Sequence, residues 1–478
     1  MVVYQVYPRS FADSGGDGLG DLAGITARLD HLAWLGVDAL WLSPINPSPM
    51  ADGGYDVADY RGVDPSFGTV EDVERLACEA TDRGIDLLLD IVPCHTSIEH
   101  PWFRERPELY VWSPVDGPPN NWRANFGGPA WTEDRHGRGW YLHSFYPEQP
   151  DLDWRNPEVA RELAAVLSFW RGKGVAGFRL DALQQLLKDP ELRDDPPATR
   201  PRLLAGETDY ETLEHVHSSD QPGVEEPLRA LRRGAGADAF LVGEIGLPCD
   251  RHGPYLGPLD ASFCFELFFS AWEAEALAAG IRAGLATGKP AWVLSNHDFP
   301  RLADRIGREN VAAAALLLLA LPGPVFLFQG DELALGNGPG RPAGAAEAPP
   351  YDRAGRDPFR HPMPWTEKPP HHGFTTGAPW LDVVVPPSGS AERQREDPGS
   401  PAAHTRELIA LRRGLVGPVE ELSARDGVLS FRRGAVGVAV NTAERPREQP
   451  WTGSVLHRTS SRSDDLLNPG SGTFVQVV

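Results

Sequence analysis

The sequence predicts a parallel (β/α)₈ barrel, with a subdomain inserted after the third strand and an antiparallel β domain at the C-terminus. Short apolar runs alternate with segments whose apolar residues recur at helical spacing, which is typical of parallel strands joined by right-handed crossovers. Several of the apolar runs are nearly continuous, as expected for strands that are covered on both faces. The chain has 478 residues, a length that fits one large barrel with additions.

The first part of the chain supplies three strands and two helices. The expected strands are residues 2–7, 37–42 and 85–92. Apolar residues recur every three or four positions from Asp21 to Gly36, which predicts a helix that Gly36 ends. Thr69 is followed three residues later by Asp72, and this capping pattern predicts a second helix that runs to Gly84.

The regular pattern stops after the third strand. Residues 96–155 are rich in Pro, Gly, Trp and Asn and contain no long helical pattern, so we interpret them as an inserted subdomain. A helix at 157–173, led by Asn156 and Pro157, then restores the pattern. The remaining barrel strands are expected at 175–180, 239–242, 261–265, 291–294 and 325–328. Helices are expected between them at 225–233, 270–287 and 308–320.

The last part of the chain is less regular. Residues 336–403 are rich in Pro and Gly, so we expect long loops around the mouth of the barrel. A helix at 404–414 precedes short β-like runs at 428–432, 436–440 and 474–478. The predicted domains are the barrel at 1–95 and 156–403, the insertion at 96–155, and the C-terminal β domain at 404–478.

Composition excludes several classes of partner. The 45 basic and 67 acidic side chains give a net charge of −22, which argues against nucleic acid and anionic membranes as partners. The four cysteines lie far apart without a CxxC pair, so neither a zinc site nor a disulfide framework is indicated. We find no signal segment and no apolar run of the ~18 residues that a membrane span needs, and we expect a cytoplasmic protein.

Polar residues that could take part in catalysis or binding follow the predicted strands. Acidic residues end the fourth, fifth and seventh strands at Asp181, Glu244 and Asp298. His95 follows the third strand, His297 precedes the last of these acids, and Arg179 lies two residues before the first on the same strand face. Because the carboxyl ends of barrel strands meet at one mouth, we expect these six side chains to share a pocket.

This residue set is compatible with several kinds of site. An ionised carboxylate beside Arg179 could attack an anomeric carbon while a second carboxyl group, with a raised pKa, protonates the leaving oxygen. The same residue types also bind divalent cations. An Arg–Asp pair at a strand end can equally be structural. Spacing alone does not choose between them, because barrels host many chemistries.

Seven stretches in order along residues 1 to about 370 carry a family resemblance. They are Gln5–Phe11, Ala51–Asp56, Asp90–His95, Gln149–Trp154, Gly177–Leu183, Val242–Ile245 and Ser295–Asp298. Together they resemble the α-amylase superfamily, glycoside hydrolase family 13, and most of all its oligo-1,6-glucosidase and α-glucosidase branch. Residues 96–155 resemble the family's domain B, and the C-terminal β region resembles its domain C.

The resemblance implies the catalytic roles. Asp181 is expected to be the nucleophile, Glu244 the general acid and then the base, and Asp298 a residue that holds the distorted sugar. Two successive displacements at one carbon retain its configuration, which requires about 5–5.5 Å between the nucleophile and the acid. Arg179 is expected to keep Asp181 ionised.

The resemblance also implies a set of side chains around one glucose. This substrate-binding set is Asp52, Tyr55, His95, Phe145, Arg179, His297 and Arg360. Tyr55 is expected to stack on the sugar ring, and the two histidines are expected to bind its hydroxyls. Asp52 is expected to pair with Arg360 from the late loop and to close the non-reducing end, so that single glucose units are removed from that end.

The loop from Asp13 to Asp21 resembles a calcium loop of some relatives. The expected ligands are Asp13, Asp17, Leu19 and Asp21, because oxygen donors at alternate positions suit Ca²⁺. Gly15 stands where an Asn ligand is usual, and the alternative is a Gly-rich turn in which Asp21 caps the following helix. We expect no cofactor for catalysis and a structural Ca²⁺ or Mg²⁺ ion in this loop.

Two further positions bear on activity. Cys94 replaces a supporting Asn of the family, and activity is expected to survive this change. Ala182 follows the nucleophile, and in the resembling branch a residue smaller than Val there accompanies α-1,4 rather than α-1,6 preference. We therefore expect an exo-acting retaining α-glucosidase that takes small α-1,4-glucosides, as a monomer or homodimer. The alternatives are a transglucosidase, a sucrose- or trehalose-active isomerase, a non-catalytic carbohydrate-binding relative, and a metal-dependent barrel hydrolase.

Overall fold

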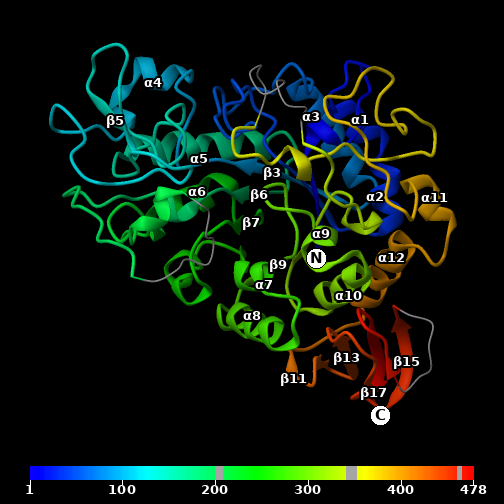
Figure 1. The fold of residues 1–478 in the computed structure, drawn as a ribbon. Coiled ribbons are helices and arrows are strands. Elements are labelled where there is room, and N and C mark those ends of the chain that lie inside the picture. The colour runs from blue at the N-terminus through cyan, green and yellow to red at the C-terminus, as the bar shows by residue number, and fades with distance from the viewer. Residues whose placement is uncertain (200–207, 341–351, 460–465, 478) are drawn as a thin grey trace.

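Eight parallel strands form a closed barrel, which confirms the predicted fold class (Figure 1). The computed structural model describes residues 1–199, 208–340, 352–459 and 466–477. Around the barrel the strands follow the order β1-β10-β9-β8-β7-β6-β3-β2. They are β1 (Val2–Val6), β2 (Ala39–Leu42), β3 (Asp86–Ile91), β6 (Gly177–Leu180), β7 (Phe240–Gly243), β8 (Ala261–Phe263), β9 (Pro290–Val293) and β10 (Val325–Phe328).

The register of three neighbouring strands places charged side chains inside the barrel. Asp90 of β3 pairs with Arg179 of β6, which in turn pairs with Val242 of β7. Because side chains at paired positions point to the same face, Asp90 and Arg179 lie side by side. Gly177 permits this close pairing, since a Cβ there would lie 2.2 Å from the carbonyl oxygen of Phe240. An acidic and a basic residue are therefore buried next to each other near the top of the barrel.

Helices cover the outside of the barrel, and one short helix lies in the insertion after β3. In the described part of the chain they are α1 (Leu22–Ala27), α2 (Leu29–Leu35), α3 (Val70–Thr81), α4 (Pro101–Glu105), α5 (Pro157–Arg171), α6 (Glu225–Ala235), α7 (Phe265–Phe269), α8 (Ala274–Ala286), α9 (Leu302–Ile306), α10 (Val311–Ala320), α11 (Ala391–Glu396) and α12 (Pro401–Arg412). None of them is long and apolar enough to cross a membrane.

The single helix expected from Asp21 to Gly36 is in fact two. The backbone leaves helical geometry at Arg28 (φ −106°, ψ 3°), where α1 ends and α2 begins. The helical spacing of apolar residues continues across this break, so the sequence pattern did not reveal it. Gly36 ends α2 in the left-handed region (φ 86°), as predicted. The predicted capping box of α3 is also present, with Thr69 and Asp72 bonded reciprocally.

The other helix boundaries differ where local capping decides them. The last predicted helix begins at Pro401 rather than at 404, because the side chain of Ser400 accepts a hydrogen bond from the amide of Ala403. The segment predicted as one helix at 270–287 forms only α8, and α7 precedes it directly after β8. The short strand at 261–265 is accordingly cut to three residues.

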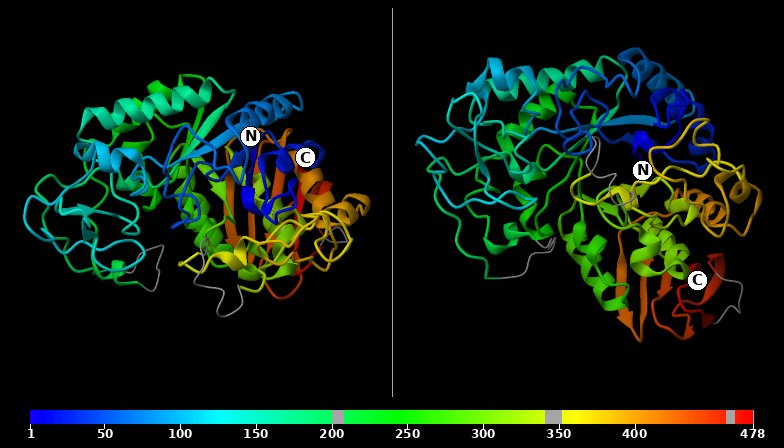
Figure 2. Two further views of the ribbon diagram at one scale, coloured as in Figure 1. Left: turned by 90° about the horizontal axis from the view of Figure 1, so that it is seen from above. Right: turned by 45° about the horizontal axis from the view of Figure 1, so that its top comes forward.

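Two β regions flank the barrel on opposite sides (Figure 2). The insertion between β3 and β6 carries a two-stranded hairpin, β4 (Trp131–Glu133) and β5 (Trp140–Leu142). The C-terminal region forms an antiparallel sheet that packs against α8 and α10. Its strands, in spatial order, are β11 (Glu420–Arg425), β12 (Val428–Arg433), β13 (Val436–Asn441), β17 (Gly472–Val477) and β15 (Gly453–Arg458). A separate pair is formed by β14 (Arg447–Glu448) and β16 (Leu466–Leu467).

The loop expected to bind a cation has its carboxylates occupied by protein donors. Asp13 accepts amide hydrogen bonds from two loop glycines at 2.7 and 2.8 Å, and Asp17 accepts one from Leu19 at 2.9 Å. Asp21 caps α1 by accepting from the amide of Gly24 at 2.6 Å. Oxygens of the three acids do not come within 4.8 Å of one another as a set. These residues do not fit a bound cation in this arrangement. Cation binding stays a prediction that requires the loop to rearrange.

Asp21→Ala tests which role the loop has. We expect this change to cost about 1 kcal/mol of stability through loss of the helix cap, measured as a lower urea midpoint. Asp17→Ala, which removes only a local turn contact, is the matched control and should leave the midpoint almost unchanged. If a cation organises the loop instead, both variants and a chelator added to the wild type will lower the melting temperature by similar amounts.

Candidate active site

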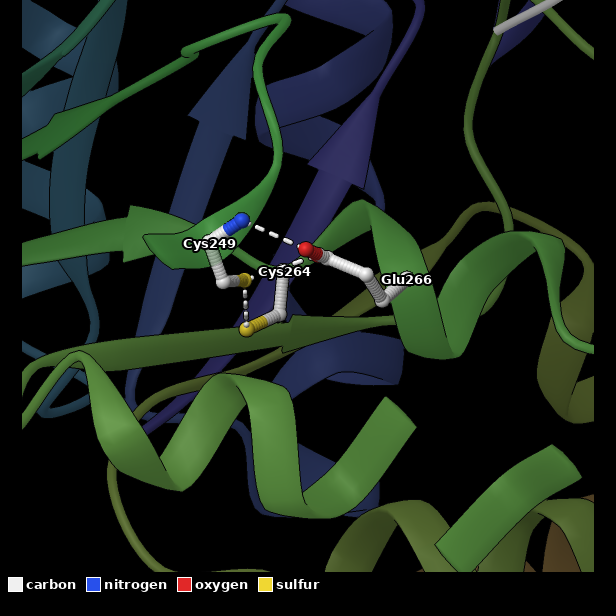
Figure 3. Close-up of side chains that lie close together, drawn as sticks. All are labelled: Cys249, Cys264 and Glu266. Atoms are coloured by element: carbon white, nitrogen blue, oxygen red, sulfur yellow. Dashed lines mark hydrogen bonds between the residues drawn. The ribbon is translucent and has the colours of Figure 1, made fainter. Parts of the chain in front are cut away.

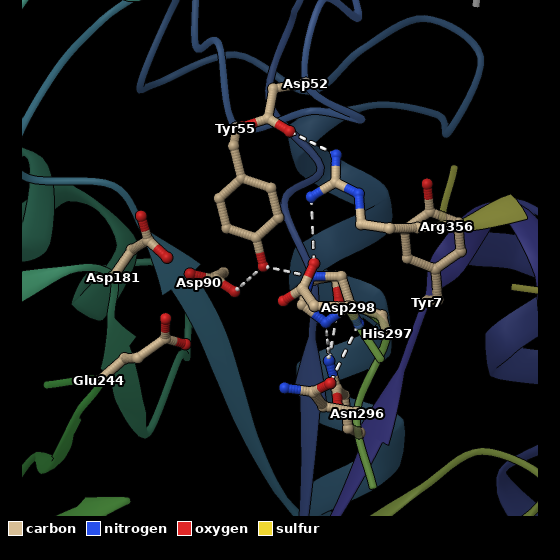
Figure 4. A network of polar contacts seen from close by, with 12 residues as sticks. Tyr7, Asp52, Tyr55, Asp90, Asp181, Glu244, Asn296, His297, Asp298 and Arg356 are labelled. Carbon is tan, nitrogen blue, oxygen red and sulfur yellow. Dashed lines mark hydrogen bonds and ion pairs between the residues drawn. The ribbon is translucent and has the colours of Figure 1, made fainter. Parts of the chain in front are cut away.

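Three carboxyl groups, those of Asp90, Asp181 and Glu244, lie close together at the carboxyl ends of three adjacent strands (Figure 4), and one arginine binds all three. Arg179 Nη1 lies 2.8 Å from Asp90 Oδ1 and 2.6 Å from Asp181 Oδ1. Its other terminal nitrogen, Nη2, contacts Glu244 Oε2. The guanidinium side chain is only 1% exposed, and the carboxyl groups of Asp181 and Glu244 reach toward solvent with 10% and 24% exposure. The two predicted catalytic carboxylates are therefore neighbours bound to one rigid planar group.

The charge balance of this cluster bears on which of its acids is ionised. Burial raises the pKa of Asp181 well above its usual range, although Arg179 opposes this effect. Burial likewise raises the pKa of Glu244, and it raises the pKa of Asp90 to about 6. Arg179 favours the ionised form of Asp181, while burial and the neighbouring acids oppose it, so the expectation that Arg179 keeps Asp181 ionised stays a prediction. When three carboxyl groups surround one cation, a state in which one of the carboxyl groups stays protonated is favoured.

The third predicted acid has the opposite electrostatics. Asp298 Oδ1 lies 3.1 Å from Arg356 Nη1 and 3.2 Å from Arg360 Nη2, and Oδ2 lies 3.4 Å from His297 Nε2. Burial opposes ionisation of Asp298, but the neighbouring positive and polar groups outweigh it and hold its pKa well below the usual range. Asp298 is therefore a stable anion beside a cluster that can carry a proton.

The arginine predicted to pair with Asp52 is the wrong one. Asp52 Oδ1 lies 2.5 Å from Nη2 of Arg356, not from Arg360. Arg356 also binds Asp352 and Asp298, so it joins three carboxylates. Arg360 lies deeper, is 1% exposed, and donates to the carbonyl oxygen of His297 at 2.8 Å. The two arginines are four residues apart in one loop, and spacing alone could not say which one reaches Asp52.

Both histidines are buried, but of the two only His95 is among the residues that line the cavity. His297 is fully buried, and its Nδ1 lies 2.8 Å from Gln5 Nε2 while its Nε2 lies 2.8 Å from the Tyr55 hydroxyl. Because an amide nitrogen can only donate, Nδ1 accepts and Nε2 carries the hydrogen. Burial lowers the pKa of His297 to about 3, so its ring is neutral. His95 lines the cavity, with Nε2 2.9 Å from Gln149 Nε2. Both ring nitrogens of His297 thus contact protein groups, and its binding to a sugar hydroxyl stays a prediction.

Tyr55 connects the histidine to the carboxylate cluster. Its hydroxyl donates to Asp90 Oδ2 at 3.0 Å. Its ring stacks on the ring of His297, with centroids 5.5 Å apart and planes 9° from parallel. The guanidinium of Arg179 lies 5.6 Å from the Tyr55 ring centroid and 5.3 Å from that of Trp41. These aromatic walls fix the guanidinium, and they stabilise its charge in a buried place.

A cavity of about 1200 Å³ opens over these groups. Its lining includes the predicted residues Asp52, Tyr55, His95, Phe145, Asp181, Glu244 and Asp298. Arg179, His297 and Arg360 lie behind this surface as supports. Aromatic side chains from the insertion, Phe126 and Tyr146, complete one wall. The cavity offers several carboxyl groups, those of Asp181, Glu244 and Asp298 among them, and flat apolar surfaces in a space that can hold a short oligosaccharide.

Three supporting residues were not assigned a role from the sequence. Asp90 could have been noticed, because it is an acid inside a nearly continuous apolar strand. Gln149 lies in a recognised motif and donates to Asp52 Oδ2 at 2.9 Å. Asp352 lies in the irregular late loop, and no periodicity could have marked it. Cys94 Sγ lies 3.1 Å from His95 Nδ1, so the cysteine still contacts the histidine beside it.

Comparison with known proteins gives the same family as the geometry. The family model "Alpha amylase, catalytic domain" matches residues 5–415. A probable α-glucosidase of Rhizobium meliloti (strain 1021) is 40% identical over 90% of this chain and 86% of its own. An oligo-1,6-glucosidase of Parageobacillus thermoglucosidasius is 34% identical over 86% of this chain and 83% of its own.

A solved structure extends the match to nearly the whole fold. The crystal structure of an α-glucosyl transfer enzyme has a TM-score of 0.88 at 34% identity, covering 99% of this chain and 98% of the other. The barrel, the insertion and the C-terminal sheet are therefore shared along with the sequence. The chain belongs to the α-amylase family of glycoside hydrolases, family 13, and to its α-glucosidase branch.

Proposed function

We propose that the protein is an exo-acting, retaining α-glucosidase that releases glucose from the non-reducing end of short α-glucosides. The observation that carries this proposal is the binding of Asp181 and Glu244 to the two terminal nitrogens of one guanidinium at the cavity floor. Retention requires two carboxyl groups close enough to act on the same anomeric carbon in turn. A shared arginine enforces that closeness.

The first half of the reaction breaks the glycosidic bond. The Asp181 carboxylate attacks the anomeric carbon as the bond to the leaving oxygen breaks, and Glu244 gives its proton to that oxygen. The raised pKa of Glu244 supports its role as the proton donor. The products are a covalent glucosyl ester on Asp181, a Glu244 carboxylate, and an aglycone that leaves as an alcohol.

The second half restores the enzyme. The Glu244 carboxylate takes a proton from a water molecule, whose oxygen attacks the same carbon and releases Asp181. Two inversions give net retention of the α configuration. Asp298, held as an anion by Arg356 and Arg360, is placed to accept hydrogen bonds from sugar hydroxyls in both steps. Such bonds assist the reaction where they strengthen as positive charge develops on the ring.

The ion pairs around Arg356 support action at a chain end. This arginine bridges Asp52 and Asp298 across one side of the cavity, and Asp352 holds it from the loop side. Because these charged groups already bind one another, they close this side of the cavity. The glucose bound here is then the non-reducing end of the substrate. The nearby pair Arg353–Glu148 fixes the same loop to the insertion at 2.9 Å.

The α-1,4 preference rests on the small residue after the nucleophile. Ala182 lines the cavity and has left-handed backbone angles (φ 44°, ψ 47°). A β-branched residue is strongly disfavoured in that region. The proposal itself follows from the resemblance, in which a residue smaller than Val at this position accompanies α-1,4 preference, and Ala182 fits that association. The cytoplasmic location and the monomer or homodimer stay predictions.

Glucosyl transfer to another sugar is the second candidate. The solved structure with a TM-score of 0.88 is an α-glucosyl transfer enzyme, and the same covalent intermediate serves both reactions. Transfer needs a sugar hydroxyl instead of water in the second step. Product analysis at high substrate concentration separates the two: free glucose alone supports hydrolysis, and longer or rearranged saccharides support transfer.

The roles of the two carboxyl groups are tested by removing each one and adding azide. We expect Asp181→Ala to lose activity on 4-nitrophenyl α-glucoside by at least about 10³-fold, because no side chain is left to attack. Azide entering at the vacated position displaces the leaving group once, so the product is β-glucosyl azide. Asp298→Ala is the control that keeps the nucleophile and gives no β-glucosyl azide.

Glu244→Ala should respond differently to the same reagents. Loss of the acid costs about 10²–10⁴-fold on maltose, and less on 4-nitrophenyl α-glucoside, whose leaving group needs little protonation. Azide then reacts with the glucosyl ester on Asp181 and gives α-glucosyl azide. If the two variants give the opposite anomers, the roles assigned to Asp181 and Glu244 are exchanged.

The linkage preference is tested on the wild-type protein, because Ala182→Val would also strain the backbone. We expect kcat/KM for maltose to exceed that for isomaltose by about tenfold or more, which corresponds to about 1.4 kcal/mol of transition-state discrimination. A kcat/KM that is higher for isomaltose would overturn the α-1,4 assignment and leave the retaining mechanism untouched.

A further inference from the structure

Two buried cysteines lie in contact behind one wall of the cavity (Figure 3). The sulfur atoms of Cys249 and Cys264 are 3.2 Å apart, and the two residues are 4% and 0% exposed. Cys249 begins a short 3₁₀ turn after β7, and Cys264 follows β8 directly. They are 15 residues apart in the chain, a spacing that gave no signal of pairing in the sequence.

A carboxylate is bound to the same pair. Glu266 Oε2 accepts the thiol hydrogen of Cys249 at 2.8 Å, and Oε1 accepts the Cys249 amide hydrogen at 2.5 Å. These two bonds fix the position of the Cys249 sulfur against that of Cys264. The contact with Cys264, burial and this carboxylate all raise the pKa of the Cys249 thiol, so the thiol keeps its hydrogen until it reacts. Glu266 is the group in contact that can accept that hydrogen when the sulfur attacks.

The pair is attached to the part of the cavity wall that follows the proposed acid. Glu244 directly follows β7. The cavity is lined by Leu247, Pro248, Asp250 and Arg251 on either side of Cys249. Phe265, which follows Cys264 and begins α7, also lines it. A covalent bond between the two sulfurs would therefore tie the wall that follows Glu244 to the end of β8.

We propose that Cys249 and Cys264 form a reversible disulfide that fixes this wall. The sulfurs must approach from 3.2 Å to the bond length of about 2.05 Å. The fold already holds the two sulfur atoms in contact, so the gap that remains to be closed is about 1 Å. Formation of the disulfide does not depend on the proposed glucosidase activity. Only an effect of the disulfide on how the cavity binds the leaving group or the acceptor rests on that function.

A small peroxide is the oxidant that balances this step. Cys249 gives its proton to Glu266, and the sulfur attacks the peroxide, which forms a sulfenic acid and releases hydroxide that is protonated to water. The Cys264 sulfur then attacks the Cys249 sulfur, the S–O bond breaks, and a second water leaves with the Cys264 proton. Two thiols lose two electrons, one peroxide gains them, and a dithiol reductant reverses the change.

The other two cysteines allow a clean test. Cys78 is exposed and Cys94 is buried at the active site, far along the chain from the pair. In a Cys78→Ser background, the protein is treated with hydrogen peroxide, denatured, alkylated and weighed. We expect alkylation of Cys94 alone, together with a peptide that joins positions 249 and 264. Without peroxide, or after dithiothreitol, all three cysteines should be alkylated.

Matched variants and a second measurement complete the test. Cys249→Ser should keep both remaining thiols after peroxide. Cys264→Ser should stop at the sulfenic acid of Cys249, because no thiol is left to displace its oxygen, and neither variant should form the disulfide. Glu266→Gln should slow oxidation without preventing it. Amide hydrogen exchange between residues 244 and 260 should be slower in the oxidised protein and return with dithiothreitol. None of these readouts uses glucosidase activity, so failure here is distinct from failure of the proposed function.

Three outcomes would overturn the proposal. Full alkylation after peroxide would show that the contact does not lead to a bond. A disulfide that includes Cys94 would show that the pair is not specific. If added Zn²⁺ protects both thiols from alkylation while chelated protein forms no disulfide, the cluster of two thiols and Glu266 is a metal site instead.

Discussion

The contact between Arg179 and three carboxyl groups is the constraint on which the site depends. A buried guanidinium is tolerated only when its charge and its donors are matched. Asp90, Asp181 and Glu244 supply that match from three strands that are adjacent in the barrel but distant in the sequence. Closure of the barrel places these strands side by side, so the fold and the catalytic geometry share one cause.

A second arginine binds the carboxylates in the rest of the site. Arg356 forms ion pairs with Asp52, Asp298 and Asp352, which lie in three separate loops. The two clusters differ in charge balance. Arg356 and Arg360 together hold Asp298 as an anion, whereas Arg179 alone faces three acids and leaves room for a proton. One site therefore contains a permanent anion beside a group that can donate a proton, which is the combination that glycoside cleavage requires.

The sequence predicted those parts of the structure that depend on local pattern. The eight strands, the capped helix α3 and the convergence of Asp181, Glu244 and Asp298 follow from apolar periodicity and from the rule that barrel strands end at one mouth. Long-range choices were not predictable in this way. The break at Arg28 interrupts no pattern, Arg356 and Arg360 are equivalent by spacing, and the sharing of Arg179 depends on strand register. The contact between Cys249 and Cys264 likewise depends on where β7 and β8 end.

The central claim is that Asp181 and Glu244 act in turn on one anomeric carbon, with Asp181 forming the covalent bond. The most direct measurement is mass spectrometry of protein quenched with acid after reaction with 5-fluoro-α-glucosyl fluoride, whose electron-poor ring slows release of the ester. The account predicts one added fluoroglucosyl group, located on the peptide that contains Asp181. A label on Glu244, or steady turnover of the reagent with no labelled protein, would contradict it.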